Sequence, residues 1–245
     1  MEKKITNFFT ALNKIQIIEK ADYTNFKNVI ETAKAISRAS NFGVYVFDYF
    51  KRSIVYASKN MLFWCGISDE EIYKNGYDTY LKYIPENDLK MLVDINNAAF
   101  DFFNKNISYQ QLDYSLSYDF HVRNFMVNQH YTPVLVKNNK IWIALCLICP
   151  SSKKTSGNVI MKTGNGNYKY SFEMKKWVLQ PTLTLSDKEK LIIRYSAQGY
   201  SMKEIAARTF SSENTIKIQK QKLFKKLNVV SISEAIRSCI ADGLL

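Results

Sequence analysis

Residues 183–227, LTLSDKEKLIIRYSAQGYSMKEIAARTFSSENTIKIQKQKLFKKL, predict three short helices, and the last of them is strongly basic. Ser212 is suited to cap this last helix because its hydroxyl can accept a hydrogen bond from an unpaired amide of the first turn. At about 100° per residue, Ile216, Leu223 and Leu227 share one face, which we expect to pack in a core. The opposite face is therefore free to meet a partner.

Positions 217–226 hold five lysines and no acidic residue. Such a face has the charge needed to displace counterions from a polyanion. A run of charge on a helix is also typical of a face that is merely solvated. The lysines alone therefore do not distinguish a polyanion-binding face from a solvated one. The whole chain of 245 residues is basic, with a net charge of +12, and residues 183–245 contribute 11 Lys and Arg against 6 Asp and Glu. Charge thus favours an anionic partner without locating it.

The residues before the basic helix add more specific signals. Gly199 stands where a helix must stop in a left-handed turn. Ser201, with Glu204 three residues later, has the pattern of a capping box. The segment resembles the helix-turn-helix of LuxR-type bacterial regulators, and the resemblance is carried by LSDKE at 185–189, AQGYSMKEIA at 197–206, SENTIK at 212–217 and KL at 226–227. Gln219 departs from it, because the family often has histidine at this position.

The resemblance implies a four-helix DNA-binding domain over residues 183–245, in which the helix from Ser212 to Leu227 enters the major groove of duplex DNA. The candidate DNA contacts form three groups: Lys217, Ile218 and Gln221 near base edges, Lys222 and Lys225 near phosphates, and Asn214 and Thr215 at the start of the helix. In this family the fourth helix makes the dimer contact. We therefore expect a homodimer, with Ile236 and Ile240 at its interface.

The chain before residue 183 divides where the hydrophobic period changes. Residues 1–40 have apolar positions at helical spacing, which predicts one or two amphipathic helices that cover either a sheet or the same helix of a second subunit. Residues 41–150 read as two strands, several short helices and three strands. This order, with the aromatic hairpin near 44–57 and the IPENDL turn at 84–89, resembles a PAS domain, whose interior is often a sensing pocket.

The expected fold class is therefore α+β: a PAS-like antiparallel sheet with short helices, followed by the all-α domain. Residues 151–182 begin with the linker composition SSKKTSG, and GNGN at 164–167 predicts a small β-hairpin. We expect Trp177 and Pro181 to dock this hairpin near the first helix of the DNA-binding domain. Such a contact would link sensor and effector mechanically.

Several other kinds of site find little support. Cys146 and Cys149 have the spacing of a metal or redox pair, but on a strand their side chains point to opposite faces. His121 and His130 lie on predicted strands without carboxylates at metal spacing, so we interpret both as structural. No motif for nucleotide binding, hydrolysis or zinc catalysis occurs, and we expect no enzyme activity. The longest apolar run is too short for a membrane span, and no signal-peptide pattern is present, so we expect a cytoplasmic protein.

The leading hypothesis is a DNA-binding transcriptional regulator that binds the duplex as a dimer under the control of a PAS-like sensor. The alternative is a ligand- or partner-binding signalling module whose C-terminal helices mainly contact proteins. The sensor's cofactor stays unknown, because an apolar, aromatic interior suits a hydrophobic small-molecule ligand, a flavin, a haem or simply a packed core.

Overall fold

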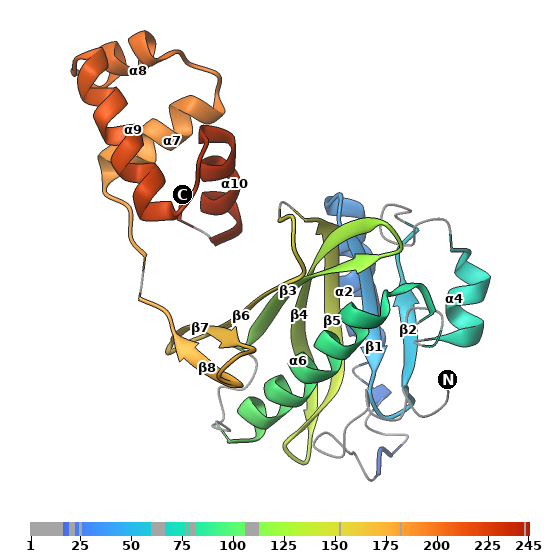
Figure 1. The fold of residues 1–245 in the computed structure, drawn as a ribbon. Helices are drawn as coiled ribbons and strands as arrows, with labels where there is room; N and C mark the ends of the chain where they lie inside the picture. The colour runs from blue at the N-terminus through green and yellow to red at the C-terminus, as the bar shows by residue number, and fades with distance from the viewer. Residues whose placement is uncertain are drawn as a thin grey trace. The chain divides into compact units, whose positions relative to one another are not determined.

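The computed structural model describes residues 17–19, 23–24, 26–59, 67–76, 78, 82–105, 113–151, 153–181, 183–242 and 244–245. The chain separates into two compact units, Met1–Gln180 and Pro181–Leu245. The first is built on an antiparallel sheet with helices, and the second contains helices alone (Figure 1). This is the α+β class expected from the sequence. Residues 1–16, 20–22 and 25 of the amphipathic segment predicted over 1–40 lie outside the described residues.

An eight-stranded sheet is the framework of the first unit, in the order β2-β1-β5-β4-β3-β6-β7-β8, and every neighbouring pair is antiparallel. Short turns join most neighbours. Asn138 and Asn139, for example, take φ angles of 50° and 58° between β4 and β5, as a tight hairpin turn requires. The strands are β1 (Gly43–Asp48), β2 (Ser53–Ala57), β3 (Ser115–Val122), β4 (Phe125–Lys137), β5 (Lys140–Pro150), β6 (Gly157–Thr163), β7 (Gly166–Ser171) and β8 (Lys176–Leu179).

Helices lie on both faces of this sheet (Figure 1). On the inner face, α6 (Glu86–Lys105) packs over the main core. On the outer face, α2 (Phe26–Ala39) packs its apolar stripe against β1 and β5, around Trp142. The sequence left open whether this amphipathic helix covers its own sheet or a second subunit, and the structure places it on its own sheet. The short α4 (Asp69–Asn75) lies beside β2.

Strands β6, β7 and β8 continue the sheet from β3, whereas the sequence led us to expect a linker with a two-stranded hairpin. The expected docking of Trp177 near the DNA-binding unit is wrong. Alternation along β8 turns this side chain to the inner face, where its Nε1 donates a hydrogen bond to the carbonyl of Ala98 in α6 at 3.1 Å. Its ring lies 5.7 Å from that of Phe102 and 5.2 Å from that of Tyr170. Trp177 therefore fastens the end of the sheet to α6.

The second unit consists of α7 (Asp187–Ala197), α8 (Met202–Arg208), α9 (Glu213–Leu227) and α10 (Ile232–Asp242). Each helix contributes to one apolar core, whose buried members are Leu185, Ile192, Ile193, Ile205, Ala206, Ile216, Leu223, Leu227, Ala235 and Cys239. The three residues expected to form the packed stripe of α9 are all among them. Within the described part of the chain, no helix is both long and apolar enough to cross a membrane.

The position of Trp177 leads to a stability prediction. Trp177→Ala removes a half-buried ring and the hydrogen bond to Ala98, so we expect it to lower the free energy of unfolding by about 2–3 kcal/mol. Urea unfolding of the full chain, followed by circular dichroism, measures this change. Lys176→Ala, an exposed neighbour on the same strand, serves as the control and should stay within about 0.5 kcal/mol of the parent. Equal stability of the two variants would contradict the conclusion that Trp177 fastens the end of the sheet to α6.

Candidate functional site

Hydroxyl side chains fix the starts of the first two helices of the C-terminal unit. Ser186 accepts a hydrogen bond from the Glu189 amide at 3.3 Å, and its own amide donates to the Glu189 carboxylate at 2.8 Å. Ser201 and Glu204 repeat this reciprocal pair at 3.3 Å and 2.8 Å. Each capping box satisfies two amides that the helix leaves unpaired, and loss of such a cap costs about 1 kcal/mol. The box predicted at Ser201 is confirmed.

The turn between α7 and α8 depends on Gly199, whose φ of +85° lies in the left-handed region. A Cβ placed on this glycine would meet nothing within 4 Å, so backbone conformation and not space requires glycine here. The following residue, Tyr200, packs edge-on against Tyr195 of α7 at 5.6 Å. The guanidinium of Arg208, at the end of α8, lies 4.2 Å from the Tyr200 ring. These contacts hold α8 at a fixed angle to α7.

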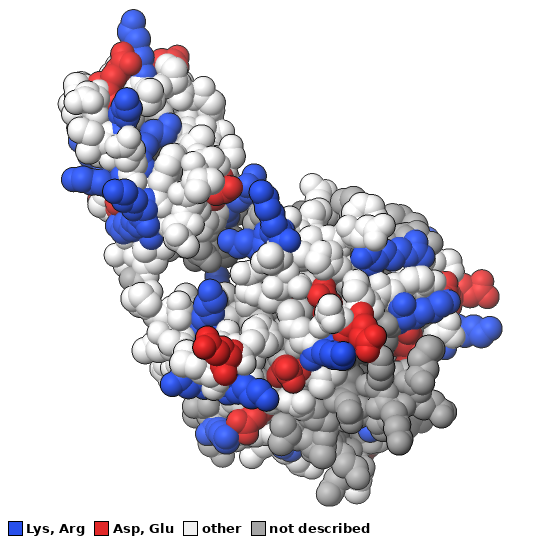
Figure 2. All heavy atoms as spheres, viewed as in Figure 1, with Lys and Arg blue, Asp and Glu red and all other residues white. Residues whose placement is uncertain are grey.

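The basic helix α9 begins after Ser212, whose hydroxyl accepts the Thr215 amide at 3.1 Å. It ends at Asn228, which takes a left-handed conformation with φ of 51°. Ile216, Leu223 and Leu227 are buried on one side of the helix. The other side is open to solvent, and Lys and Arg side chains gather over the face of the unit that α9 presents in Figure 2.

All seven residues predicted to contact DNA belong to this open side or to its beginning. Six are exposed: Asn214, Lys217, Ile218, Gln221, Lys222 and Lys225. Ile218, the one aliphatic side chain among these six, is 44% exposed. Thr215 is half-buried, and its hydroxyl lies 2.8 Å from that of Ser212, so this residue also supports the cap. Contact of these residues with DNA stays a prediction.

Two of the five lysines of α9 are not freely exposed to solvent: Lys226 is paired with a carboxylate and Lys220 is half-buried. Lys226 donates to the carboxylate of Glu189 in α7 at 2.8 Å and so joins the two helices. Lys220 is half-buried, and desolvation lowers the pKa of its ammonium. The sequence did not reveal the pair between Lys226 and Glu189, because 37 residues separate them. Lys217, Lys222 and Lys225 therefore carry the exposed charge of this helix.

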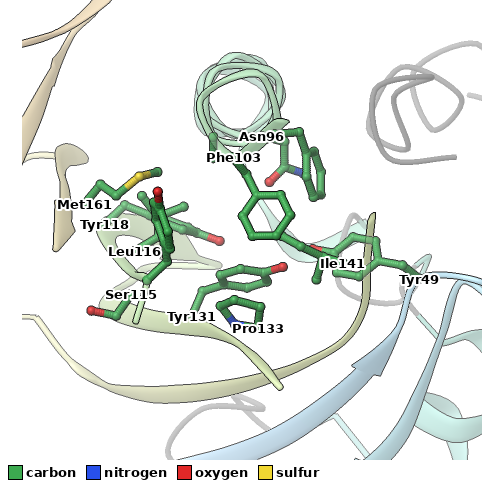
Figure 3. Close-up of a pocket in the computed structure, with 13 residues that line it drawn as sticks. Tyr49, Asn96, Phe103, Ser115, Leu116, Tyr118, Tyr131, Pro133, Ile141 and Met161 are labelled. Atoms are coloured by element: carbon green, nitrogen blue, oxygen red, sulfur yellow. The ribbon is translucent and has the colours of Figure 1, made fainter. Parts of the chain in front are cut away.

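The first unit contains a small cavity between α6 and the sheet (Figure 3). Its volume of about 30 Å³ is enough for one water molecule. No charged side chain is among the described residues that line it, which are Tyr49, Asn96, Ala99, Phe100, Phe103, Tyr114, Ser115, Leu116, Tyr118, Tyr131, Pro133, Ile141 and Met161. The cavity is thus aromatic and uncharged.

Two polar atoms of this cavity wall are buried without a well-formed hydrogen bond among the described residues: Nδ2 of Asn96, and the hydroxyl of Tyr131, which interacts only with the Tyr49 phenol. Such atoms are costly unless something satisfies them. Burial raises the pKa of the phenols of Tyr49, Tyr118 and Tyr131, so all three are neutral at physiological pH. The cavity therefore offers neutral hydrogen-bond donors in an apolar setting.

The histidines and most buried carboxylates have structural surroundings. Oδ2 of Asp88 accepts hydrogen bonds from the His121 amide at 2.6 Å and is 2.9 Å from His121 Nδ1, and its Oδ1 accepts from Ser156 at 2.9 Å. On the outer face, burial lowers the pKa of His130. Within the described residues, no group of three or more potential metal ligands comes together.

The C-terminal unit is similar to proteins of a known family. Residues 183–239 match the family described as bacterial regulatory proteins, luxR family. A nitrate/nitrite response regulator protein homolog from Haemophilus influenzae is 45% identical over 51 residues, which are 21% of this chain and 24% of that protein. The chain thus spans about a quarter of the length of this curated relative. The C-terminal unit contains a LuxR-family helix-turn-helix domain.

Two solved structures align with most of the chain. A phage VqmA–DPO complex covers 92% of both chains with 14% identity and a TM-score of 0.35. The VqmA dimer of Vibrio cholerae, described in the absence of its target DNA, covers 88% of both chains with 14% identity and a TM-score of 0.31. At these scores neither alignment supports an argument about the first unit.

The turn at Gly199 leads to a prediction on the geometry of the site. Gly199→Ala should lower the free energy of unfolding of the C-terminal unit by about 1 kcal/mol, because alanine resists a φ of +85° although nothing obstructs its methyl group. Thermal unfolding followed by far-ultraviolet circular dichroism measures the loss. Gly199→Asn is the matched control, since asparagine tolerates the left-handed region better and should restore part of the stability. An alanine variant as stable as the parent would contradict this account.

Proposed function

We propose that the protein is a transcriptional regulator that binds duplex DNA as a homodimer and whose first unit is a PAS-like sensor. The observation that carries this proposal is that α9 exposes one face to solvent while its apolar stripe is buried in the core of a LuxR-family helix-turn-helix domain. A helix with one face fixed in a core and the other polar and basic is suited to the major groove. The Haemophilus influenzae protein that is similar over 51 residues is a nitrate/nitrite response regulator homolog, and this similarity supports a regulatory function.

In this proposal α9 lies in the major groove. Ile218 and Gln221 lie opposite the buried stripe and Lys217 flanks them, and we assign these three side chains to the base edges. Lys222 and Lys225 contact phosphates, which position the helix without reading sequence. Asn214 and Thr215, together with the free amides of the first turn, bind a phosphate at the start of the helix.

The dimer contact is assigned to α10. Ile240 of this helix is 66% exposed, and Val230 in the preceding loop is 85% exposed. Apolar side chains this open to water favour a partner surface. Ile236 is half-buried and already packs against the core of its own unit, so it contributes less new buried area than Ile240. We assign the protein to the cytoplasm, where its DNA target is accessible.

The sensor assignment rests on the order of elements in residues 41–150 and on the cavity. Two strands, helices and three strands follow each other as in the PAS resemblance, with α6 over the inner face. The unpaired Asn96 amide and the poorly satisfied Tyr131 hydroxyl favour a small, neutral ligand with hydrogen-bond acceptors, whereas a charged ligand would lack a counter-ion. At its present volume the cavity must widen to admit such a ligand.

A physical route joins the cavity to the end of the first unit. Asn96 and Ala99 of α6 line the cavity, and Ala98 between them accepts the hydrogen bond from Trp177. Trp177 is in β8, three residues before Gln180, where the first unit ends. We propose that displacement of α6 by a ligand is transmitted through β8 to the chain that enters the DNA-binding unit.

Selection of genomic fragments by the purified protein, followed by titration against salt, tests the DNA-binding function. A discrete enriched sequence element is the expected result, and Lys225→Ala should lower the slope of log affinity against log salt by about 1 per protomer. Lys74→Ala, which removes the same charge from an exposed position in α4, is the control and should leave the slope unchanged. Recovery of protein partners but no enriched DNA would favour the partner-binding module instead.

The cavity leads to a second prediction. In the ligand-free protein, Tyr131→Phe should change the melting temperature little, because the buried hydroxyl that it removes makes no well-formed hydrogen bond and interacts only with the Tyr49 phenol. In the presence of a bound neutral ligand the same substitution should weaken binding by about tenfold, as loss of one hydrogen bond predicts. Thermal unfolding and native mass spectrometry of the purified protein measure both effects. A destabilised ligand-free variant would show that the hydroxyl is already satisfied.

A further inference from the structure

The excess positive charge of the first unit is concentrated in its last strands. Residues 151–180 contain six lysines and a single acidic residue, Glu173. By contrast, residues 1–150 contain 17 Lys and Arg against 15 Asp and Glu, so they are almost neutral. The basic character of the chain outside the DNA-binding unit therefore belongs mainly to strands β6–β8 and their flanks.

Alternation along these strands brings three of the lysines to the same face. Met161 of β6, Tyr168 and Tyr170 of β7 and Trp177 of β8 all join the inner core under α6. Neighbouring residues in a strand point to opposite sides, so Lys162, Lys169 and Lys176 lie on the outer face.

The register of the sheet sets these lysines on a diagonal. Lys162 pairs with Asn167, which is two residues from Lys169. Lys169 in turn pairs with Val178, which is two residues from Lys176. Diagonal neighbours of this kind are about 7–8 Å apart. The row therefore crosses three adjacent strands at nearly regular intervals.

Two members of this row, Lys169 and Lys176, are available to a partner. Lys169 and Lys176 are exposed, as is Lys175 in the adjoining turn, and within the described residues none of the three forms a salt bridge. Lys162 is half-buried and interacts with its surroundings, so it plays a smaller part. On the opposite face, Trp177 fastens the same strands to α6. We name Lys169 and Lys176, together with the exposed Lys175 of the adjoining turn, the β-lysine face.

We propose that the β-lysine face is a second DNA-contacting surface, which binds phosphates of the duplex beside the segment that α9 occupies. The inference rests on the proposed DNA-binding function and adds to it a contact from the first unit. Lysines on a rigid sheet neutralise phosphates without reading bases, so this surface increases affinity and the length of the footprint but not sequence specificity.

Chain length is the argument for DNA as the partner of this face. Lys176 precedes Ser186, the N-cap of α7, by ten residues. Ten residues span at most about 35 Å when fully extended, which is close to one turn of the duplex. When the second unit is bound in the major groove, the β-lysine face is thus held within about one duplex turn of the start of α7. A polyanion is then present at high local concentration.

The test uses the full chain with Lys169→Gln, Lys175→Gln and Lys176→Gln combined, against a matched triple variant in the same unit. Lys27→Gln, Lys59→Gln and Lys74→Gln together remove equal charge from exposed positions away from β6–β8. Two duplexes are compared: the element recovered by genomic selection alone, and the same element with about one turn, ~10 base pairs, added on each side.

On the longer duplex, the β-lysine variant should lower the slope of log affinity against log salt by about 2–3 per protomer, and so by about 5 for the homodimer, since each phosphate contact contributes about 0.9. It should also shorten the protected footprint. On the short duplex it should behave like the parent, and the matched triple variant should behave like the parent on both. An unchanged slope on the longer duplex overturns the inference while leaving DNA binding through α9 intact.

Two other outcomes are distinguishable. A parent protein that binds neither duplex overturns the proposed function itself. Loss of binding to anionic phospholipid vesicles by the β-lysine variant, with no change in its DNA affinity, would assign this face to a membrane surface and overturn its role on DNA.

Discussion

The carboxylate of Asp88 is buried at the first turn of α6, 6% exposed, and a charge in that position is strongly unfavourable unless it is paired. It is satisfied from two directions, by the amide and ring of His121 in β3 and by the hydroxyl of Ser156 just before β6. Because these bonds require all three segments to meet at one point, they fix where α6 begins on the sheet. The remaining features of the first unit follow from that placement.

With its start fixed, α6 crosses the inner face and presents Asn96, Ala99 and Phe103 to the cavity. One residue from Ala99, the carbonyl of Ala98 receives the Trp177 bond that fastens β8. The cavity and the end of the sheet therefore share a single helix. A ligand can shift an equilibrium only through different affinities for two states, and a cavity of about 30 Å³ that must widen around α6 supplies such a difference. The proposed coupling to DNA is reciprocal by linkage: bound DNA must change ligand affinity by the same factor.

Sequence reasoning succeeded where the determining contacts are local. The capping box at Ser201 and the turn at Gly199 depend on residues only a few positions apart, and the buried stripe of α9 follows from helical geometry alone. It failed at Trp177, whose partner Ala98 is 79 residues away. An aromatic residue near a domain boundary predicts a packing partner but does not identify which one. The residues that line the cavity and the hydrogen bonds of Asp88 were not predicted for the same reason, since His121, for example, is 33 residues from Asp88.

The two units expose their lysine side chains through different kinds of secondary structure. In the second unit, α9 uses helical periodicity: its apolar stripe is buried, and Lys226 is drawn to Glu189, so that Lys217, Lys222 and Lys225 are left in the open. In the first unit, the alternation of side chains along a strand exposes the lysines. Because Trp177 is buried under α6, its neighbour Lys176 points to the outer face. The β-lysine face is thus a geometric consequence of the contact that secures β8. A change in α6 that loosened Trp177 would also disturb that face, so a ligand in the cavity would act on both proposed DNA contacts through one side chain.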